Sequence, residues 1–179
     1  MISFPLPLLG FAAFSGTGKT TLLCEIIPLL KEKGFHIGVI KHSHHDIEID
    51  HPKKDTFALR KSGAEKVLIS SQKRTALIIE HSDKTTESTL EEALKDIHPE
   101  GLDLVLIEGF KHADIPKIEL HRKALNKPYI YLDDKNIIAV ATDHELADEN
   151  APYKLDLNQP VQIANYIVEN MINEHSNKK

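Results

Sequence analysis

The sequence predicts an α/β domain in which helices flank a mostly parallel sheet, with a β-hairpin excursion. Short apolar runs of strand length alternate with segments that carry apolar residues at helical spacing, as in repeated strand, helix and strand units. The first run, residues 8–14, is apolar almost throughout, which is typical of a strand buried on both faces. The length of 179 residues fits a single domain. We expect this domain over residues 1–172 and a polar C-terminal tail over 173–179.

The first apolar run leads into a glycine-rich stretch that reads FSGTGKTT. Gly16 and Gly18 permit a tight turn whose backbone N–H groups point at phosphate oxygens, and the following helix adds its positive N-terminal end. Lys19 would reach the β- and γ-phosphates, and the Thr20 hydroxyl would bind Mg²⁺. The pattern GxxxxGK[ST] expects a glycine where this chain has Ala13. The strand before this stretch, the helix after it and the spacing of its residues predict a P-loop and a P-loop NTPase-like fold. The alternative is a glycine-rich turn with a surface lysine.

The other elements follow from the same two patterns. Helices are expected over residues 18–33, from 55 to Gly63, after the capping box Ser88-Thr89-Leu90-Glu91, and from Asn158 and Pro160 onward. Strands are expected over residues 36–41, 66–71, 75–80, 102–109, 117–120, 137–141 and 153–157. The short link between the second and third of these strands predicts a hairpin.

The strand over residues 102–109 is the expected neighbour of the P-loop strand, because it is the second most apolar run and ends in an acid. In P-loop NTPases a carboxylate at this position completes the magnesium site, directly or through water. Glu108 is therefore the candidate for holding magnesium or positioning water, unless it only caps Gly109. Asp103 precedes the apolar run and would fall at the opposite end of the strand.

The polar segment KHSHHDIEIDH, residues 41–51, begins at the expected phosphate edge of the sheet. Three interpretations remain open. Its imidazoles and carboxylates suit a transition-metal site. Alternatively, it recognises substrate and phosphate, with charge from Lys41, hydrogen bonds from His42 and His45, and Asp46 helping to hold Mg²⁺. The third interpretation is a solvated polar loop.

Two further places carry candidate ligand groups. Asp55 and Arg60 flank a short helix. They either contact a ligand that lies over the P-loop, or serve as a helix cap and a surface ion pair. Asp143 follows a predicted strand within ATD, where its carboxylate can accept hydrogen bonds from the guanine N1–H and exocyclic amine. The full NKxD signature of many GTPases is missing.

Composition narrows the partners and the compartment. The 22 Lys plus Arg and 27 Asp plus Glu residues give a formal net charge of −5, which does not favour binding to nucleic acid. The apolar runs fall short of the roughly 18 residues that a membrane span requires, so no membrane is expected as a partner. Cys24 is the only cysteine, so the sequence predicts no disulfide framework and favours a reducing, cytoplasmic compartment.

Five segments carry a more specific signal: FAAFSGTGKTTL, GVIKHSHHDIEIDHPKKDT, ALRKSGA, LDLVLIEGFKH and IIAVATD. Together they resemble the MobB family of molybdopterin-guanine dinucleotide biosynthesis adapter proteins. The resemblance runs from about Leu8 to Asp143, and KHSHHD and EGFKH are far more discriminating than the P-loop. The alanine at position 13, a departure from the general pattern, agrees with this family.

The resemblance implies a GTP-binding protein with weak hydrolysis, a homodimer that works beside the guanylyltransferase that attaches GMP to molybdopterin. It implies magnesium coordination by Thr20 and Glu108, with residues 42–46 and the segment GFKH, which begins at Gly109, facing the ligand. The residues that it assigns to nucleotide binding are Ser15, Gly16, Thr17, Gly18, Lys19, Thr20 and Thr21.

Three functions of different classes remain. The first is an adapter NTPase, in which catalysis rests on charge stabilisation by Lys19, magnesium and backbone amides. The second is a small-molecule kinase, in which residues 42–55 bind an acceptor and Asp46 or Asp55 accepts its proton. The third is a pure binding module without hydrolysis. A kinase is disfavoured because the arginines are scattered along the chain, at Arg60, Arg74 and Arg122.

Overall fold

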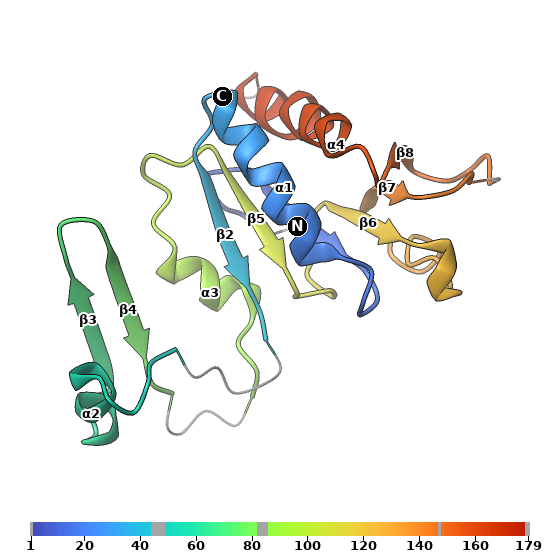
Figure 1. The fold of residues 1–179 in the computed structure, drawn as a ribbon. Coiled ribbons are helices and arrows are strands. Elements are labelled where there is room, and N and C mark those ends of the chain that lie inside the picture. Colours follow the sequence, from blue (N-terminus) through green and yellow to red (C-terminus); the bar gives the residue numbers. More distant parts are fainter. Residues whose placement is uncertain (1, 44–48, 82–85, 147, 178–179) are drawn as a thin grey trace. The chain divides into compact units, whose positions relative to one another are not determined.

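The computed structural model describes residues 2–43, 49–81, 86–146 and 148–177 (Figure 1). The chain divides into two compact units, one formed by Met1–His42 with Thr89–Lys179 and the other by Ser43–Ser88. We call them the main unit and the small unit and describe each by itself. The P-loop lies in the main unit, and the predicted hairpin lies in the small unit.

The main unit is built on a parallel sheet. Its described residues form six strands in the order β2-β5-β1-β6-β7-β8, and every neighbouring pair is parallel. Their bounds are β1 Leu8–Ala12, β2 Ile37–Lys41, β5 Leu104–Glu108, β6 Lys117–His121, β7 Ile137–Thr142 and β8 Tyr153–Asp156. The strand that ends at Glu108 lies beside β1, as predicted. The prediction of a mostly parallel sheet flanked by helices is confirmed.

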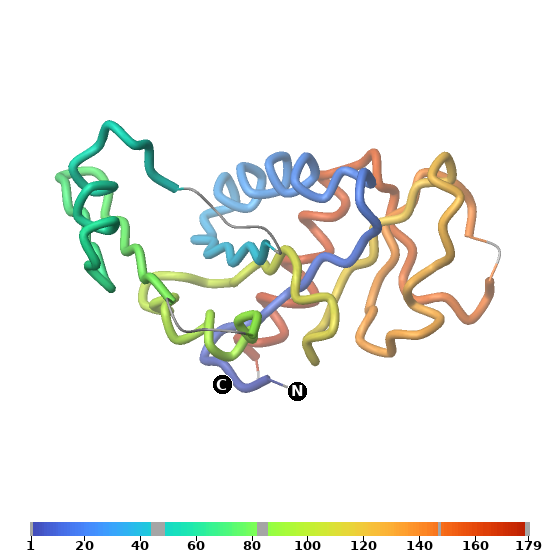
Figure 2. Tube along the Cα trace, turned by 90° about the horizontal axis from the view of Figure 1, so that it is seen from below, coloured from blue at the N-terminus to red at the C-terminus, as the bar shows by residue number. Residues whose placement is uncertain are grey.

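Both faces of this sheet are buried, which explains the continuous apolar runs. Leu104 and Leu106 of β5 join a core that includes side chains of α1 (Lys19–Glu32) and α4 (Pro160–Ile167). Val105 and Ile107 alternate with them and join a second core with α3 (Leu90–Asp96). Figure 2 shows α1 and α3 on opposite sides of the strands. Burying each such side chain stabilises the fold by about 1.5–3 kcal/mol, so the central strands hold their carboxyl ends firmly.

Two helix starts differ from the sequence prediction. The capping box of α3 uses Thr89 and Glu92 rather than Ser88 and Glu91: the Thr89 hydroxyl accepts the N–H of Glu92 at 3.2 Å, and the Glu92 carboxylate accepts the N–H of Thr89 at 3.1 Å. The start at residue 90 places Leu90 and Leu94 one turn apart and buries both.

The last helix begins without a side-chain cap. Pro160 opens α4 as predicted, but the residue before the helix is Gln159, and its side chain makes no capping hydrogen bond. Helical turns then continue through Val168–Asn173 and Glu174–Ser176, so the expected tail begins with helical residues. Within the described residues, no helix is long and apolar enough to cross a membrane.

The small unit consists of α2 (Asp55–Lys61) and a hairpin of β3 (Lys66–Ser70) and β4 (Thr75–Ile79). The predicted hairpin is confirmed, with the N–H of Ser71 donating to the Arg74 carbonyl across the turn. Val67 and Ile78 oppose each other in the ladder and are both buried.

Candidate functional site

The P-loop of residues 13–18 connects β1 to α1 at the carboxyl edge of the sheet. Gly16 and Gly18 adopt φ angles of 82° and 99°, a region that disfavours other residue types. Thr17 closes the turn, because its buried hydroxyl donates to the Phe14 carbonyl at 2.8 Å. The predicted tight turn is therefore present, and its glycines stand where the backbone needs them.

Lys19, the first residue of α1, folds back over this loop. Its Nζ donates to the Ala13 carbonyl at 3.1 Å. Burial lowers the pKa of Lys19, and Lys41 lowers it further, whereas Glu108 opposes both effects. A phosphate oxygen offers this ammonium a full negative charge in place of a neutral carbonyl.

Glu108 lies at the centre of the predicted magnesium site. Its Oε1 accepts the Thr20 hydroxyl at 3.0 Å, and its Oε2 pairs with Lys41 Nζ at 3.3 Å. Lys41 and Glu108 are register partners at the ends of β2 and β5, so the sheet itself sets this pair. The sequence predicted all three residues as site residues, and the structure brings them together.

Asp103, the other acid near β5, lies at the opposite end of this strand from Glu108. The N–H of His36 donates to Asp103 Oδ2 at 2.7 Å, and the N–H of Asp103 donates to the His36 carbonyl at 2.8 Å. Both residues precede their strands, whereas Glu108 ends β5. Asp103 therefore ties the amino ends of β2 and β5 together and has no part in the P-loop site.

His42 and Gly109 meet directly beyond these strands. The N–H of His42 donates to the Glu108 carbonyl at 2.8 Å, and its ring stacks on Phe110 with centroids 4.4 Å apart. Gly109 has a φ of 97°, and a Cβ there would lie 2.8 Å from His42 Cβ. Two predicted residues of this loop, His45 and Asp46, lie outside the described residues.

Asp143 is held by the segment that follows β6. Its Oδ1 accepts the N–H of Lys123 at 3.0 Å, and Oδ2 faces Arg122 at 3.6 Å. The Lys123 N–H, the His144 ring and the Arg122 guanidinium hold the pKa of Asp143 below its ordinary value of 3.8, against the effect of burial. A cavity of about 420 Å³ adjoins Asp143 beyond β7 and β8, and Lys154 also lines it.

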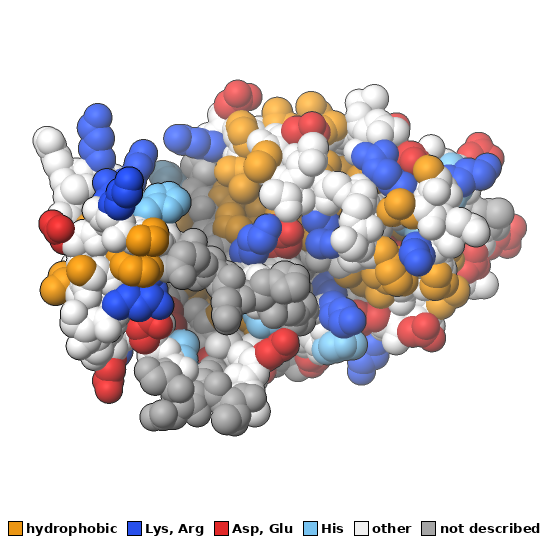
Figure 3. All heavy atoms as spheres, turned by 60° about the horizontal axis from the view of Figure 1, so that its bottom comes forward, with side chains coloured by type: hydrophobic (Ala, Val, Ile, Leu, Met, Phe, Trp, Pro, Cys, Tyr) orange, Lys and Arg blue, Asp and Glu red, His pale blue; other side chains and the backbone are white. Residues whose placement is uncertain are grey.

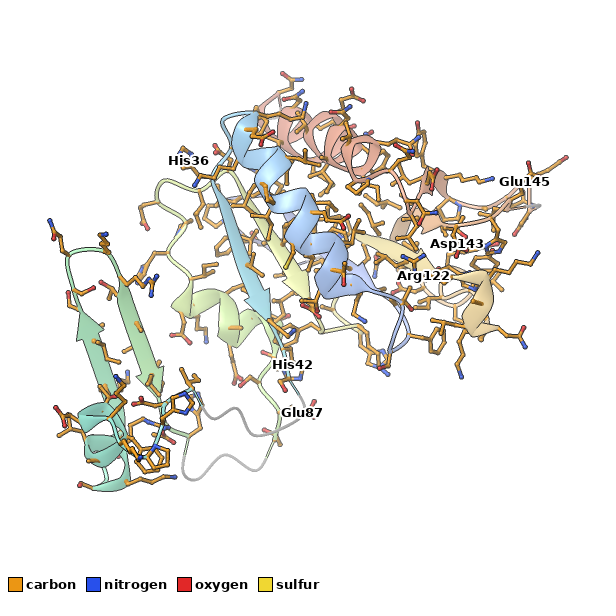
Figure 4. All side chains as sticks on the ribbon, viewed as in Figure 1. His36, His42, Glu87, Arg122, Asp143 and Glu145 are labelled. Carbon is orange, nitrogen blue, oxygen red and sulfur yellow. The ribbon has the colours of Figure 1, made fainter. Side chains whose placement is uncertain are left out.

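Arg122 is the residue that sequence reasoning missed. Its Nε donates to the Thr17 carbonyl at 3.0 Å, which places a cation against the P-loop (Figure 4). Arg122 directly follows β6, the strand on the other side of β1, but the β6 sequence KIELH is not an apolar run, so the local sequence gave no signal for this contact. The scatter of the arginines along the chain hid this proximity.

The remaining candidates are accounted for within the described residues. Arg60 donates to Glu80 at 2.6 Å inside the small unit, which agrees with an ion pair, although the Arg60 side chain is only 8% exposed and so is not a surface group. Asp55 is the first residue of α2, but Lys54 occupies the cap position and no side chain caps this helix, so the predicted cap was wrong. No described group of three or more His, Cys, Asp or Glu side chains is arranged to hold a metal ion. Acidic and basic side chains are interspersed over the face shown in Figure 3.

Comparison with known proteins gives a consistent result. The family model MobB, described as molybdopterin guanine dinucleotide synthesis protein B, matches residues 8–143. The chain is 45% identical over 165 residues to the molybdopterin-guanine dinucleotide biosynthesis adapter protein of Escherichia coli (strain K12), covering 92% of this chain and 93% of that protein. It is 38% identical over 162 residues to the protein of the same name from Haemophilus influenzae, covering 90% of this chain and 88% of that protein.

Solved structures show the same fold. A crystal structure of molybdopterin-guanine biosynthesis protein B superposes with a TM-score of 0.69 at 24% identity, over 90% of this chain and 98% of that one. A structure of Bacillus subtilis MobB gives 0.69 at 21% identity, over 93% and 98%. From the family match and the identity to these relatives, this chain belongs to the MobB family.

Proposed function

We propose that this chain is a GTP-binding adapter protein with weak GTPase activity that assists the attachment of GMP to molybdopterin in molybdopterin-guanine dinucleotide biosynthesis. The observation that carries the proposal is the convergence of Lys19, Thr20, Lys41 and Glu108 at one P-loop. The names of the relatives from Escherichia coli and Haemophilus influenzae supply the pathway. The proposed compartment is the cytoplasm.

Phosphate binding follows from the loop. The N–H groups of residues 15–21 and the N-terminal end of α1 would receive the phosphates. Lys19 would exchange the Ala13 carbonyl for a β- or γ-phosphate oxygen, a stronger partner because it is charged. Lys41, next to Glu108, adds a second positive charge at the same edge.

The residues fit a magnesium ion. The Thr20 hydroxyl and the Glu108 carboxylate are oxygen donors already in contact, and Mg²⁺ prefers oxygen ligands with several positions left to water and phosphate. Asp46, outside the described residues, is the further proposed ligand. When bound, Mg²⁺ would neutralise charge on the phosphates.

Slow hydrolysis is supported by how Glu108 is held. Both of its oxygens are occupied, by Thr20 and Lys41, which suits a metal ligand better than a free general base. Lys19 and the backbone amides, together with the charge of bound Mg²⁺, would then support catalysis through charge stabilisation without a general base. Such a site binds nucleotide well and turns it over slowly.

Guanine selection is assigned to Asp143. It follows β7 at the carboxyl edge of the sheet, where ligands bind in α/β folds. Its depressed pKa keeps the carboxylate ionised, so it can accept two donors from the guanine edge.

A homodimer is proposed from the small unit. Leu68 and Leu77 oppose each other on β3 and β4 and are 64% and 51% exposed, on the face opposite the buried Val67 and Ile78. A two-stranded hairpin with an uncovered apolar pair is only marginally stable in water, so a second copy would cover it. Light scattering of the purified chain measures the oligomeric state, and a strict monomer would contradict this part.

The central experiment is nucleotide-dependent binding to the molybdenum cofactor guanylyltransferase, the proposed partner that handles molybdopterin. Calorimetry with GTP, with GDP and without nucleotide should detect a complex with a nucleotide-dependent affinity. Lys19→Ala should weaken GTP binding by about 10- to 100-fold, as expected for a charged hydrogen bond, with Lys31→Ala as the matched control on the same helix. Unchanged GTP affinity in Lys19→Ala would refute the phosphate assignment. A phosphorylated small molecule formed faster than free phosphate would identify a kinase instead.

A further inference from the structure

Arg122 joins two parts of the main unit that are far apart in sequence. Its Nε donates to the Thr17 carbonyl of the P-loop at 3.0 Å, and its NH1 faces Asp143 Oδ2 at 3.6 Å. A Cβ placed on Gly18 would lie 4.0 Å from Arg122 NH2, so the guanidinium lies alongside the loop itself. One planar side chain therefore touches both the phosphate cradle and the carboxylate beyond β7 (Figure 4).

The segment that carries Arg122 also fixes the orientation of Asp143. The N–H of Lys123 donates to Oδ1, whereas the Arg122 guanidinium approaches Oδ2. The His144 ring nitrogen Nδ1 lies 3.0 Å from the same oxygen, Oδ1. Residues that directly follow β6 and β7 thus contact both carboxylate oxygens of Asp143.

From this geometry we infer that Arg122 is a positioning residue for guanine selectivity, which sets the Asp143 carboxylate in register with the P-loop. The inference rests on the proposed function, because it takes Asp143 as the group that reads the guanine edge. A nucleotide is held at its phosphates by the loop and at its base by Asp143. Selectivity then depends on the spacing between these two points, and Arg122 is the contact that spans it.

Lysine could not replace this side chain. The guanidinium donates from several nitrogens in a fixed plane, so it can contact Thr17 and Asp143 at once, whereas an ammonium is a single flexible point charge. The Arg122 side chain is 37% exposed, and an exposed ion pair contributes little to folding. Its removal should therefore change recognition more than stability.

The test compares GTP and ATP affinities by calorimetry for the wild type, Arg122→Ala, Arg122→Lys, Asp143→Asn and the double variant. Arg122→Ala and Arg122→Lys should each reduce GTP affinity about tenfold and ATP affinity by less than about threefold, so the preference for GTP narrows. In the Asp143→Asn background, Arg122→Ala should leave the GTP to ATP ratio unchanged, because the two residues act through one contact. Arg74→Ala, in the hairpin turn of the small unit, is the matched control and should change neither affinity.

The outcomes separate this inference from the proposed function. If the wild type binds GTP no better than ATP, the site does not select guanine. That result would refute both the guanine-selecting role of Asp143 and the positioning role of Arg122. A wild type that prefers GTP, together with Arg122 variants that keep the full preference, overturns the role of Arg122 alone. Equal losses for GTP and ATP would also overturn it, because they would reveal only a general contact with phosphate or with the fold.

Discussion

The Thr20 hydroxyl donates to Glu108 Oε1 at 3.0 Å, although 88 positions separate the two residues in the chain. The contact exists because β1 and β5 are parallel neighbours, so the loop after one strand meets the last residue of the other. Glu108 is 13% exposed in its side chain, and Lys41 approaches its second oxygen. A hydroxyl, a carboxylate and an ammonium are thus placed at the opening of α1 before any ligand arrives.

Glu108→Gln should weaken the magnesium dependence of GTP binding. The amide keeps the shape and one acceptor, but it loses the negative charge that balances Lys41 and would attract Mg²⁺. We expect the apparent Mg²⁺ affinity, measured by titrating magnesium into the GTP complex, to fall by about 10- to 100-fold. Glu25→Gln, an exposed position on α1, is the control and should leave it unchanged. Equal magnesium affinities for wild type and Glu108→Gln would remove Glu108 from the site.

Gly109→Ala should destabilise the main unit by more than Gly34→Ala. Both glycines have a positive φ, 97° and 91°, so both substitutions carry backbone strain of about 1–2 kcal/mol. Only at Gly109 would the new Cβ meet another atom, at 2.8 Å from His42 Cβ, whereas nothing lies within 4 Å at Gly34. Urea unfolding of the two variants isolates the cost of that contact, and equal losses of stability would show that the His42 contact yields without cost.

Features that depend on local sequence were predicted correctly, whereas a contact between residues far apart in the chain was not. The central strands β1 and β5 were predictable because burial on both faces makes them almost entirely apolar, and the hairpin because its turn is local. The P-loop could be found because it follows the apolar strand β1, and Glu108 because it ends the apolar strand β5. Arg122 could not, because its partner Thr17 is 105 positions away and nothing in its local sequence distinguishes it from a surface arginine.

The start of α3 was predicted one residue too early. Ser88 and Glu91 fit the same spacing rule as Thr89 and Glu92, so the local pattern alone does not choose between them. The choice is made by the core, because starting at residue 90 buries Leu90 and Leu94 against the second face of the sheet.

Thr89→Ala should therefore lower the free energy of unfolding by about 0.5–2 kcal/mol, since the substitution leaves the N–H of Glu92 without its capping oxygen. Chemical denaturation measures this loss. Glu91→Ala, at the position that the sequence pattern assigned to the capping box, is the comparison and should cost less than Glu92→Ala, because the Glu92 carboxylate accepts the N–H of Thr89. The reverse ranking of these two variants would mean that the helix starts one residue earlier, as the sequence pattern alone suggested.

Glu119 provides a pH-dependent test of the loop that follows β6. This carboxylate is fully buried on β6 and accepts the N–H groups of Ile130 and Tyr131 at 2.8 and 2.9 Å. Burial raises the pKa of Glu119 above its ordinary value of 4.5, although the two N–H groups oppose the shift. The folded state therefore holds this proton more tightly than the unfolded chain does.

The sign of the effect follows from linkage. A group with a raised pKa in the folded state adds stability that is fully present below 4.5 and is lost as the pH rises through the folded value. Glu119→Gln does not titrate, and it loses one of the two accepted hydrogen bonds at a cost of about 1–3 kcal/mol at every pH. The stability advantage of the wild type over Glu119→Gln should therefore be largest near pH 4.5 and shrink toward neutral pH. Urea unfolding of both proteins across this range, with the exposed Glu149→Gln as control, measures the difference in their free energies of unfolding. If this difference grows as the pH rises, the two N–H groups affect the pKa of Glu119 more than burial does.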